Sequence, residues 1–209
     1  MTNSYGPYMH RMSFLDDTNL EEVNAHARHC QAIIDNFMWS EATHCTAGMH
    51  FLIRHFTKGV NVYNIKAGSE YNLTDLEDYV NTVVRKRLGI VPDKVTFLAS
   101  ANYEVHRRHL ADLMKPLIDT VDKLLGYGLQ VTIYNGEHDV ICNTIGTRKH
   151  LDGYKKSTRA EFATKSHRLA GYVKSYRTLK FIYVLRSGHM VPLDSPESGL
   201  YVLQQIIGN

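Results

Sequence analysis

The spacing of hydrophobic residues predicts helices in the first half of the chain. Two apolar runs repeat at helical intervals, and each is preceded by a capping box, Thr18 with Glu21 and Thr74 with Glu77. Gly89 follows the second run, where a glycine commonly ends a helix. A third apolar stretch, 37–56, has mixed periodicity. The two regular runs are Leu20, Val23, Ala27, Cys30 and Ile34, and Leu76, Val80, Val83, Val84 and Leu88.

The pattern changes near Met114. Pro116 suits the first turn of a helix whose apolar stripe stops at Gly126. Residues 130–134 then resemble a buried strand, and 171–176 with 179–185 resemble the two strands of a hairpin. The run Ser195-Pro196-Glu197 begins a last helix, and its apolar residues Leu200, Leu203 and Ile207 share one side.

Helices that alternate with strands are typical of an α/β sheet. The pattern therefore predicts a mainly helical region over 1–113, inserted into or leading up to an α/β lobe over 114–209. A chain of 209 residues suits one domain, or a core with a sizeable insertion.

Composition excludes several functions. A hydrophobic content of 44% excludes disorder as the main description. The 24 basic and 21 acidic residues form no block of one sign, so we expect no nucleic-acid partner. Because no apolar run approaches the roughly 20 residues that span a bilayer, we expect no membrane partner. The first residues lack the charged start and apolar stretch of a signal peptide.

The 12 histidines and three cysteines invite a metal site, since His26, His29 and Cys30 are followed by His44 and Cys45. Structural zinc sites usually pair ligands with two to four residues between them, which neither His-Cys neighbour provides. A Cys30–Cys45 disulfide, or two buried thiols, explains these cysteines better. We therefore predict no metal and no cofactor.

Two short motifs carry the candidate chemistry, each just past a predicted strand. The first is Gly136-Glu137-His138-Asp139, and the second is Gly188-His189. Active-site groups of such sheets gather at the carboxyl ends of strands, so Asp139 and His189 could meet. A neutral imidazole can take a proton from an attacking hydroxyl while a carboxylate holds its other nitrogen. We expect Gly188 to allow a sharp turn before the histidine.

The nucleophile of such a triad is missing from the 209 residues, since no Gly-x-Ser-x-Gly elbow occurs among them. Ser4 is the nearest substitute, but Thr2 stands where the first glycine belongs and Pro7 falls where the helix would begin. Cys142, close to Asp139, is a second candidate nucleophile, although reactivity depends on exposure and local pKa.

The two motifs and several others resemble the serine carboxypeptidases, in particular the retinoid-inducible branch. The resemblance covers nearly the whole chain but begins after the position of the nucleophile elbow. The matching segments are Gly6-Pro7-Tyr8, Glu41-Ala42-Thr43, Gly59-Val60-Asn61-Val62-Tyr63-Asn64-Ile65, Met114-Lys115-Pro116, Gly136-Glu137-His138-Asp139-Val140-Ile141-Cys142-Asn143, Val173-Lys174-Ser175-Tyr176 and Gly188-His189-Met190-Val191-Pro192, with Asp194-Ser195-Pro196-Glu197 after them.

The resemblance implies the C-terminal part of an α/β-hydrolase fold with a mainly helical cap. It places the triad acid at Asp139 and the triad base at His189. It also implies that Met190 lines the pocket for the leaving residue, with plain core packing as the alternative, and that Cys142 is a thiol packed near the active site.

The activity implied is hydrolysis of C-terminal peptide bonds, without a cofactor, in a secreted, lysosomal or vacuolar protein. In that setting Asn72-Leu73-Thr74 is a glycosylation sequon. The substrate partners would be peptide C-termini. Because the nucleophile lobe is absent from these residues, three readings remain: a fragment, one chain of a two-chain enzyme whose N-terminal lobe comes from another chain, or a non-catalytic peptide-binding protein.

Overall fold

The first predicted apolar run forms the longest helix. A computed structural model describes residues 2–68, 71–99, 103–151 and 158–208. In it, α2 (Asp17–Asp35) buries Val23, Ala27 and Cys30. The helix starts earlier than predicted, because the side chain of Asp16 accepts a hydrogen bond of 2.8 Å from the Asn19 amide. Thr18 is therefore inside the helix, and its predicted capping role is wrong.

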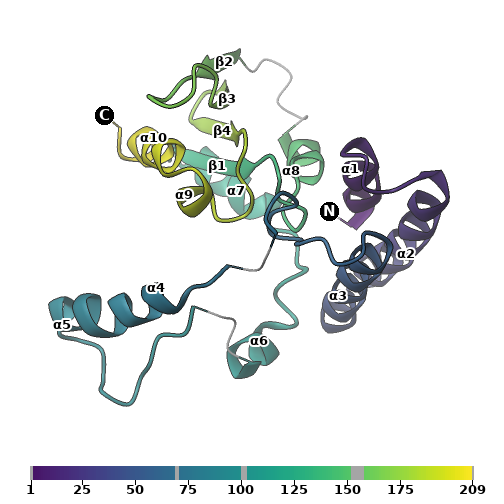
Figure 1. Ribbon diagram of the computed structural model, residues 1–209, viewed down its shortest axis with the longest axis horizontal. Coiled ribbons are helices and arrows are strands. Elements are labelled where there is room, and N and C mark those ends of the chain that lie inside the picture. The colour runs from purple at the N-terminus through teal and green to yellow at the C-terminus, as the bar shows by residue number, and fades with distance from the viewer. Residues whose placement is uncertain (1, 69–70, 100–102, 152–157, 209) are drawn as a thin grey trace.

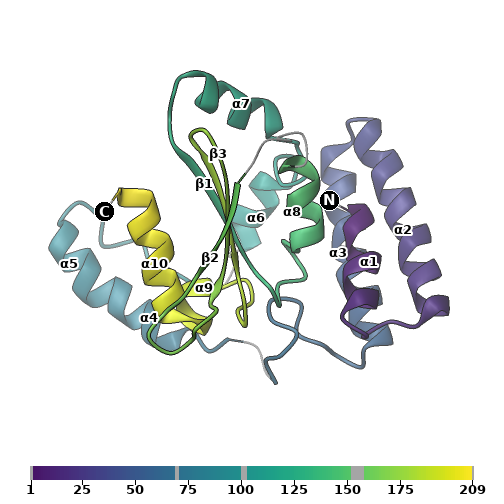
Figure 2. The ribbon, with the colours of Figure 1, turned by 90° about the horizontal axis from the view of Figure 1, so that it is seen from above.

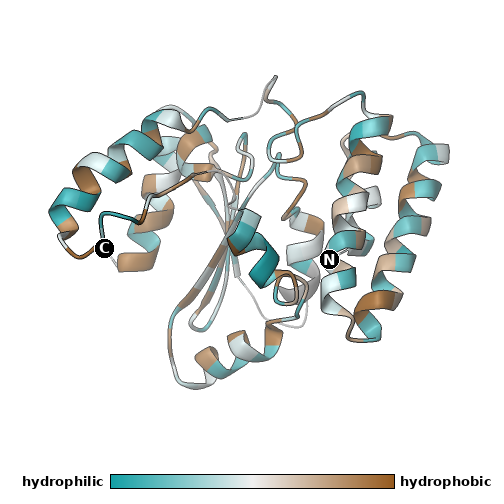
Figure 3. Cartoon of the chain, turned by 90° about the horizontal axis from the view of Figure 1, so that it is seen from below, coloured by the Kyte–Doolittle hydropathy of each residue, from teal (hydrophilic) through white to brown (hydrophobic). Residues whose placement is uncertain are grey.

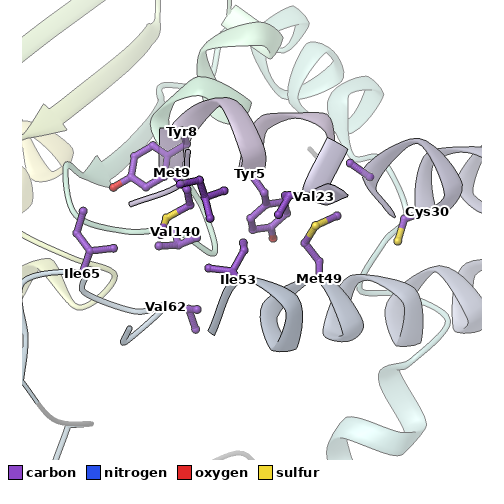
Figure 4. Packing of buried hydrophobic residues seen from close by; sticks show 12 residues of the cluster. Tyr5, Tyr8, Met9, Val23, Cys30, Met49, Ile53, Val62, Ile65 and Val140 are labelled. Carbon is purple, nitrogen blue, oxygen red and sulfur yellow. The ribbon is translucent and has the colours of Figure 1, made fainter. Parts of the chain in front are cut away.

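Helix α2 packs with α3 (Trp39–Phe56) and with the unpredicted pair η1 (Thr2–Ser4) and α1 (Tyr5–Arg11). Their facing side chains make the largest buried cluster, shown in Figure 4. It also takes in Val62, Ile65 and Val140 from outside these helices. Since Val140 follows Asp139, this core continues directly into the loop that carries the predicted acid.

A disulfide between Cys30 and Cys45 joins α2 to α3. The structure thus decides between the two readings left open for these cysteines. With both sulfurs bonded to each other, neither is available as a thiolate ligand, although His26 lies beside them. Cys142 is the free cysteine of the described residues, and it is half-buried.

The second predicted run forms one continuous helix from Thr74 to Leu88. It consists of α4 (Thr74–Tyr79), the π-helical turn η2 (Val80–Val84) and α5 (Arg85–Leu88). Gly89 ends it with a left-handed φ of 64°, as predicted. The capping box at Thr74 is wrong, because Thr74 is already helical and its amide donates to the Asn72 side chain at 3.1 Å.

This helix and α6 (Tyr103–His109) extend from the rest of the molecule as an arm (Figure 1). None of their described residues is buried. Figure 3 nevertheless shows hydrophobic bands along α4–α5, as on α2 and α3. The predicted apolar stripe is real, but within the described chain it has little to pack against.

The second half builds a four-stranded mixed sheet in the order β1-β4-β3-β2. Strands β1 and β4 run parallel, and β3 is antiparallel to both β4 and β2. The hairpin of β3 and β4 was predicted, whereas β2 was not. The strands are β1 (Val131–Gly136), β2 (Thr158–Phe162), β3 (Gly171–Tyr176) and β4 (Leu179–Val184).

Helices cover both faces of the sheet (Figure 2). One face packs against the C-terminal helices, and the other faces α8, beyond which α1–α3 lie. The remaining helices are α7 (Ile118–Gly126), α8 (Thr144–Leu151), α9 (Val191–Asp194) and α10 (Pro196–Ile207). Among the described residues, no helix combines the length and the apolar character needed to cross a bilayer.

Three local predictions in this half need correction. Pro116 precedes α7 by two residues instead of lying in its first turn. Strand β1 continues through Asn135 and Gly136, two residues beyond the predicted end at 134. On α10 the side facing the sheet carries Ser198 and Val202, so the predicted stripe is exposed. Its members Leu200, Leu203 and Ile207 are 56%, 50% and 60% exposed.

Candidate active site

The carboxylate of Asp139 is buried at the end of β1 and is held from two sides. The residue is 2% exposed. Its Oδ1 accepts a 3.0 Å hydrogen bond from the Cys142 amide, and its Oδ2 lies 2.9 Å from His189 Nδ1. The first contact folds the loop back on itself, so the second oxygen points toward the histidine.

His189 follows β4, the strand parallel to β1. Because the register pairs Gly136 with Val184, the two loops leave the sheet side by side. The Asp139 side chain is 3% exposed, against 35% for His189. The structure therefore brings Asp139 and His189 together, as the sequence predicted. The carboxylate is buried and the imidazole is partly exposed.

Glycines allow the two loops to touch. A Cβ on Gly136 would lie 2.3 Å from the Ser187 carbonyl oxygen, and one on Gly188 would lie 2.4 Å from the Tyr63 carbonyl oxygen. Neither glycine has a positive φ. The turn before His189 therefore uses no left-handed glycine, and what requires the small size of Gly188 is the backbone of Tyr63 and Asn64 that crosses directly over it.

The hydrogen bond to Asp139 raises the pKa of His189 to about 10, with a further contribution from the Cys142 thiol. Burial acts in the opposite direction, since it disfavours the charged ring. In the described chain the imidazolium is consequently the main form of His189 at neutral pH.

The segment Val62–Ile65, which we call the strap, ties both loops to the helical region. It binds the acid loop through two backbone hydrogen bonds of 3.1 Å, from Val140 N to Val62 O and from Ile65 N to His138 O. It binds the base loop through a 2.7 Å bond from His189 N to Tyr63 O. The ring of Tyr63 also meets the His189 ring edge-on, with centroids 5.5 Å apart.

The role of the strap was not predicted from the sequence. Its residues were quoted only as a matching segment. One signal was present: the segment holds two asparagines, a residue type that favours turns. The side chain of Asn61 accepts from Tyr63 N, and that of Asn64 accepts from Lys66 N.

The other candidate residues are Cys142, Met190 and Ser4, and they differ in how they lie relative to Asp139 and His189. Cys142 presents its sulfur within 4.8 Å of ligand atoms of Asp139 and His189, so these three side chains are a geometric candidate for a metal as well. Met190 is half-buried directly after His189, and its pocket role remains a prediction. Ser4 is 1% exposed at the start of α1, which is unsuited to attack on a peptide.

His138 is buried beside the acid loop, where burial lowers its pKa and nearby Glu137 opposes that effect. Behind the acid loop, Tyr5 donates a 3.0 Å bond to the Ile141 carbonyl and lies 3.3 Å from His50 Nε2. Burial lowers the pKa of His50. These groups support the loop from its inner side.

Comparison with known proteins decides the family. The family model for serine carboxypeptidase matches residues 1–209. The chain belongs to the serine carboxypeptidase family. Retinoid-inducible serine carboxypeptidase of Mus musculus is 32% identical over 239 aligned positions, which cover 97% of this chain and 53% of the relative. Carboxypeptidase Y of Saccharomyces cerevisiae is 33% identical over 71% of this chain and 31% of its own length.

Among solved structures, the prohormone-processing carboxypeptidase Kex1(Δ)p of Saccharomyces cerevisiae superposes with a TM-score of 0.76 and 22% identity. The match covers 99% of this chain and 51% of that one. The fold is therefore of the α/β-hydrolase type. The chain spans about half the length of the serine carboxypeptidases that it matches.

Proposed function

We propose that Asp139 and His189 are the acid and base of a serine-type carboxypeptidase whose nucleophile lies outside these 209 residues. The observation that carries the proposal is the 2.9 Å contact between the two side chains at the ends of adjacent parallel strands. In an α/β-hydrolase the acid and then the base follow the nucleophile in chain order, and this chain presents them in that order.

The chemistry follows from the orientation of the imidazole. Asp139 holds Nδ1–H, which leaves Nε2 as the nitrogen that accepts a proton from a serine hydroxyl. As the serine oxygen bonds to the peptide carbonyl carbon, that proton passes to His189, which then donates it to the departing amine. Water repeats the sequence on the acyl-enzyme and releases the acid.

A base must be neutral to accept a proton, yet the pKa of His189 is raised to about 10 in this chain. Covering the half-exposed ring with another lobe would desolvate the imidazolium and lower that pKa toward neutrality. We therefore propose that assembly with the nucleophile lobe also tunes the base.

Three features of the α/β lobe support the presence of such a partner lobe. Among the described strands β1 pairs with β4 alone, so one edge of it is open. Asn135, at the end of β1, buries an Oδ1 that has no hydrogen-bond partner in the described residues. The outer face of α10 is apolar and exposed. A strand added beside β1 would supply donors for that edge.

The compartment proposed is secretory, lysosomal or vacuolar. The Cys30–Cys45 disulfide favours an oxidising environment. Asn72 of the sequon is exposed and precedes α4, where a glycan would meet no core residue.

The test uses native material captured with an antibody against this chain and treated with a fluorophosphonate that labels activated serines. We expect a labelled serine in the captured polypeptides, and hydrolysis of a blocked dipeptide. Both should be lost when His189→Ala is expressed instead, and kept with His29→Ala, which changes an exposed histidine on α2.

The label on a separate polypeptide would identify a two-chain enzyme, and on the same polypeptide a longer single chain. Either result supports the assignment of the acid and base. Capture of intact protein without label or hydrolysis overturns it. Retained binding of peptides would then favour the non-catalytic reading.

A further inference from the structure

The backbone just before His189 donates a hydrogen bond to a carboxylate that the proposed mechanism does not use. Asp194, on α9, accepts two hydrogen bonds of 2.7 Å at its Oδ2, one from the Gly188 amide and one from the Tyr71 hydroxyl. Bonds to an ionised acceptor are stronger than neutral ones. Tyr71 precedes α4, so the carboxylate joins the loop of His189 to the start of the arm.

Asp194 also closes a short turn of backbone around His189. The Asp194 amide donates to the Met190 carbonyl at 3.0 Å, while the Asp194 side chain reaches back to Gly188. His189 and Met190 thus lie between two contacts of a single residue. These two contacts restrain the backbone on either side of His189.

Two consecutive amides are held by acceptors from different directions. Gly188 N donates to Asp194, and His189 N donates to the strap at Tyr63 O. There is little room for the backbone to shift toward the strap, because Gly188 is buried and even an added Cβ would overlap Tyr63 and Asn64. The loop that bears His189 is therefore fixed from both sides.

Tyr71 keeps Asp194 in place. Its hydroxyl is partly desolvated, and burial together with the hydrogen bond to Asp194 raises the pKa of Tyr71 above its ordinary value. The phenol therefore stays protonated and continues to donate. Without it, Asp194 Oδ2 would keep only the bond from the Gly188 amide, and water would compete for the carboxylate.

We propose that Asp194 is a positioning residue that sets the direction of the His189 imidazole toward Asp139, and that Tyr71 locks Asp194 in that arrangement. The proposal rests on the proposed function for the role of His189 as a base. The lock itself is a property of the described chain and can be measured without catalysis.

The first test follows the His189 ring by NMR titration in the 209-residue chain. In the unchanged protein we expect a midpoint of about 10. Asp194→Ala should move it toward the ordinary value of about 6.5 as the bond to Asp139 loosens. Tyr71→Phe removes one hydroxyl and should move it in the same direction by less, while Asp194→Asn, which keeps one acceptor oxygen, should restore most of the value.

Glu197 provides the matched control. It lies three residues after Asp194, and its carboxylate likewise accepts from a backbone amide and a hydroxyl, both of Ser166. Within the described residues its carboxylate makes no hydrogen bond or ion pair with the base loop, so Glu197→Ala should leave the His189 midpoint unchanged.

The second test measures kcat and KM in the captured native enzyme. A misdirected base should lower kcat about 10- to 100-fold in Asp194→Ala with KM within about twofold. Tyr71→Phe should lower kcat about threefold to tenfold.

The inference is overturned if Tyr71→Phe and Asp194→Ala leave the His189 midpoint unchanged in folded protein, or if Glu197→Ala shifts it equally. Because Tyr71→Phe removes a single oxygen, it decides the question even if Asp194→Ala fails to fold. A shifted midpoint in material that labels no serine would uphold the lock and reject the proposed function.

Discussion

The group α1–α3 and the arm α4–α6 have similar hydrophobic patterns and opposite degrees of burial. Val23, Met49 and Ile53 are fully buried in the first group, whereas Leu76 and Leu88 of the arm are 41% and 54% exposed. Helical periodicity shows which side of a helix is apolar, but it does not show whether another part of the chain packs against that side. In this chain the partner of the first group is the acid loop itself, which joins the core through Val140.

The largest loss of stability should come from truncating a side chain in the buried group α1–α3. Met49→Ala removes a fully buried side chain and should lower the free energy of unfolding by about 2–5 kcal/mol. Leu76→Ala, on the arm, should change it by less than about 0.5 kcal/mol. Urea unfolding followed by circular dichroism measures both. Equal losses would mean that the arm is packed in solution against something the described chain does not show.

The disulfide gives the next effect, because it ties the two longest helices of the buried group together. Replacing both Cys30 and Cys45 by alanine opens a loop of 15 residues and should cost about 3 kcal/mol. Thermal melts with and without a reducing agent measure it. Reduction should lower the melting temperature of the natural chain and leave the double variant unchanged; a variant as stable as the oxidised parent would contradict this.

The acid–base pair should make stability depend on pH. Since the pKa of His189 is raised to about 10 from an unfolded value of about 6.5, its contribution is fully present below about 6.5 and is lost as the pH rises through about 10. Asp139→Asn removes it. The stability difference between parent and variant should therefore shrink between pH 6 and pH 10.5, taking these as approximate limits of that window. A difference that grows with pH would reverse the assignment.

The smallest change in stability should come from the exposed face of α10. Leu203→Gln replaces a half-exposed side chain and should alter the free energy of unfolding by less than about 0.5 kcal/mol. It should reduce self-association of the isolated chain, measured by sedimentation at rising concentration. Val202→Ala, one residue earlier and 3% exposed, is the control and should destabilise the fold.

The sequence predicted several of the helices and the paired motifs, because both depend on local order. The side of α2 and the hairpin β3–β4 follow from spacing alone, and the sequence placed Asp139 and His189 after strands that proved to be neighbours. Strand β2 was missed because its alternation is short and weak, with only Ala160 and Phe162 apolar and only Phe162 buried. Its pairing with β3 makes it a strand.

What sequence reasoning missed is long-range. Asp16 and Thr18 are both capping residues by type, and only the path of the chain before α2 selects the first. Nothing near Tyr63 or Asp194 indicates that one will accept from His189 and the other from Gly188, since those bonds span more than a hundred residues in one case and cross a loop in the other. Likewise the small size required at Gly188 depends on where the strap passes.

The parallel register of β1 and β4 sets the spacing between the two loops that carry Asp139 and His189. Each residue along a strand advances about 3.3 Å, which is more than the 2.9 Å separating Asp139 from His189. One residue inserted within either strand would consequently move a loop out of reach of the other. A protein engineer who grafts a reporter or an affinity tag into this lobe should therefore leave β1 and β4 at their present lengths, so that the side chains of Asp139 and His189 keep their spacing.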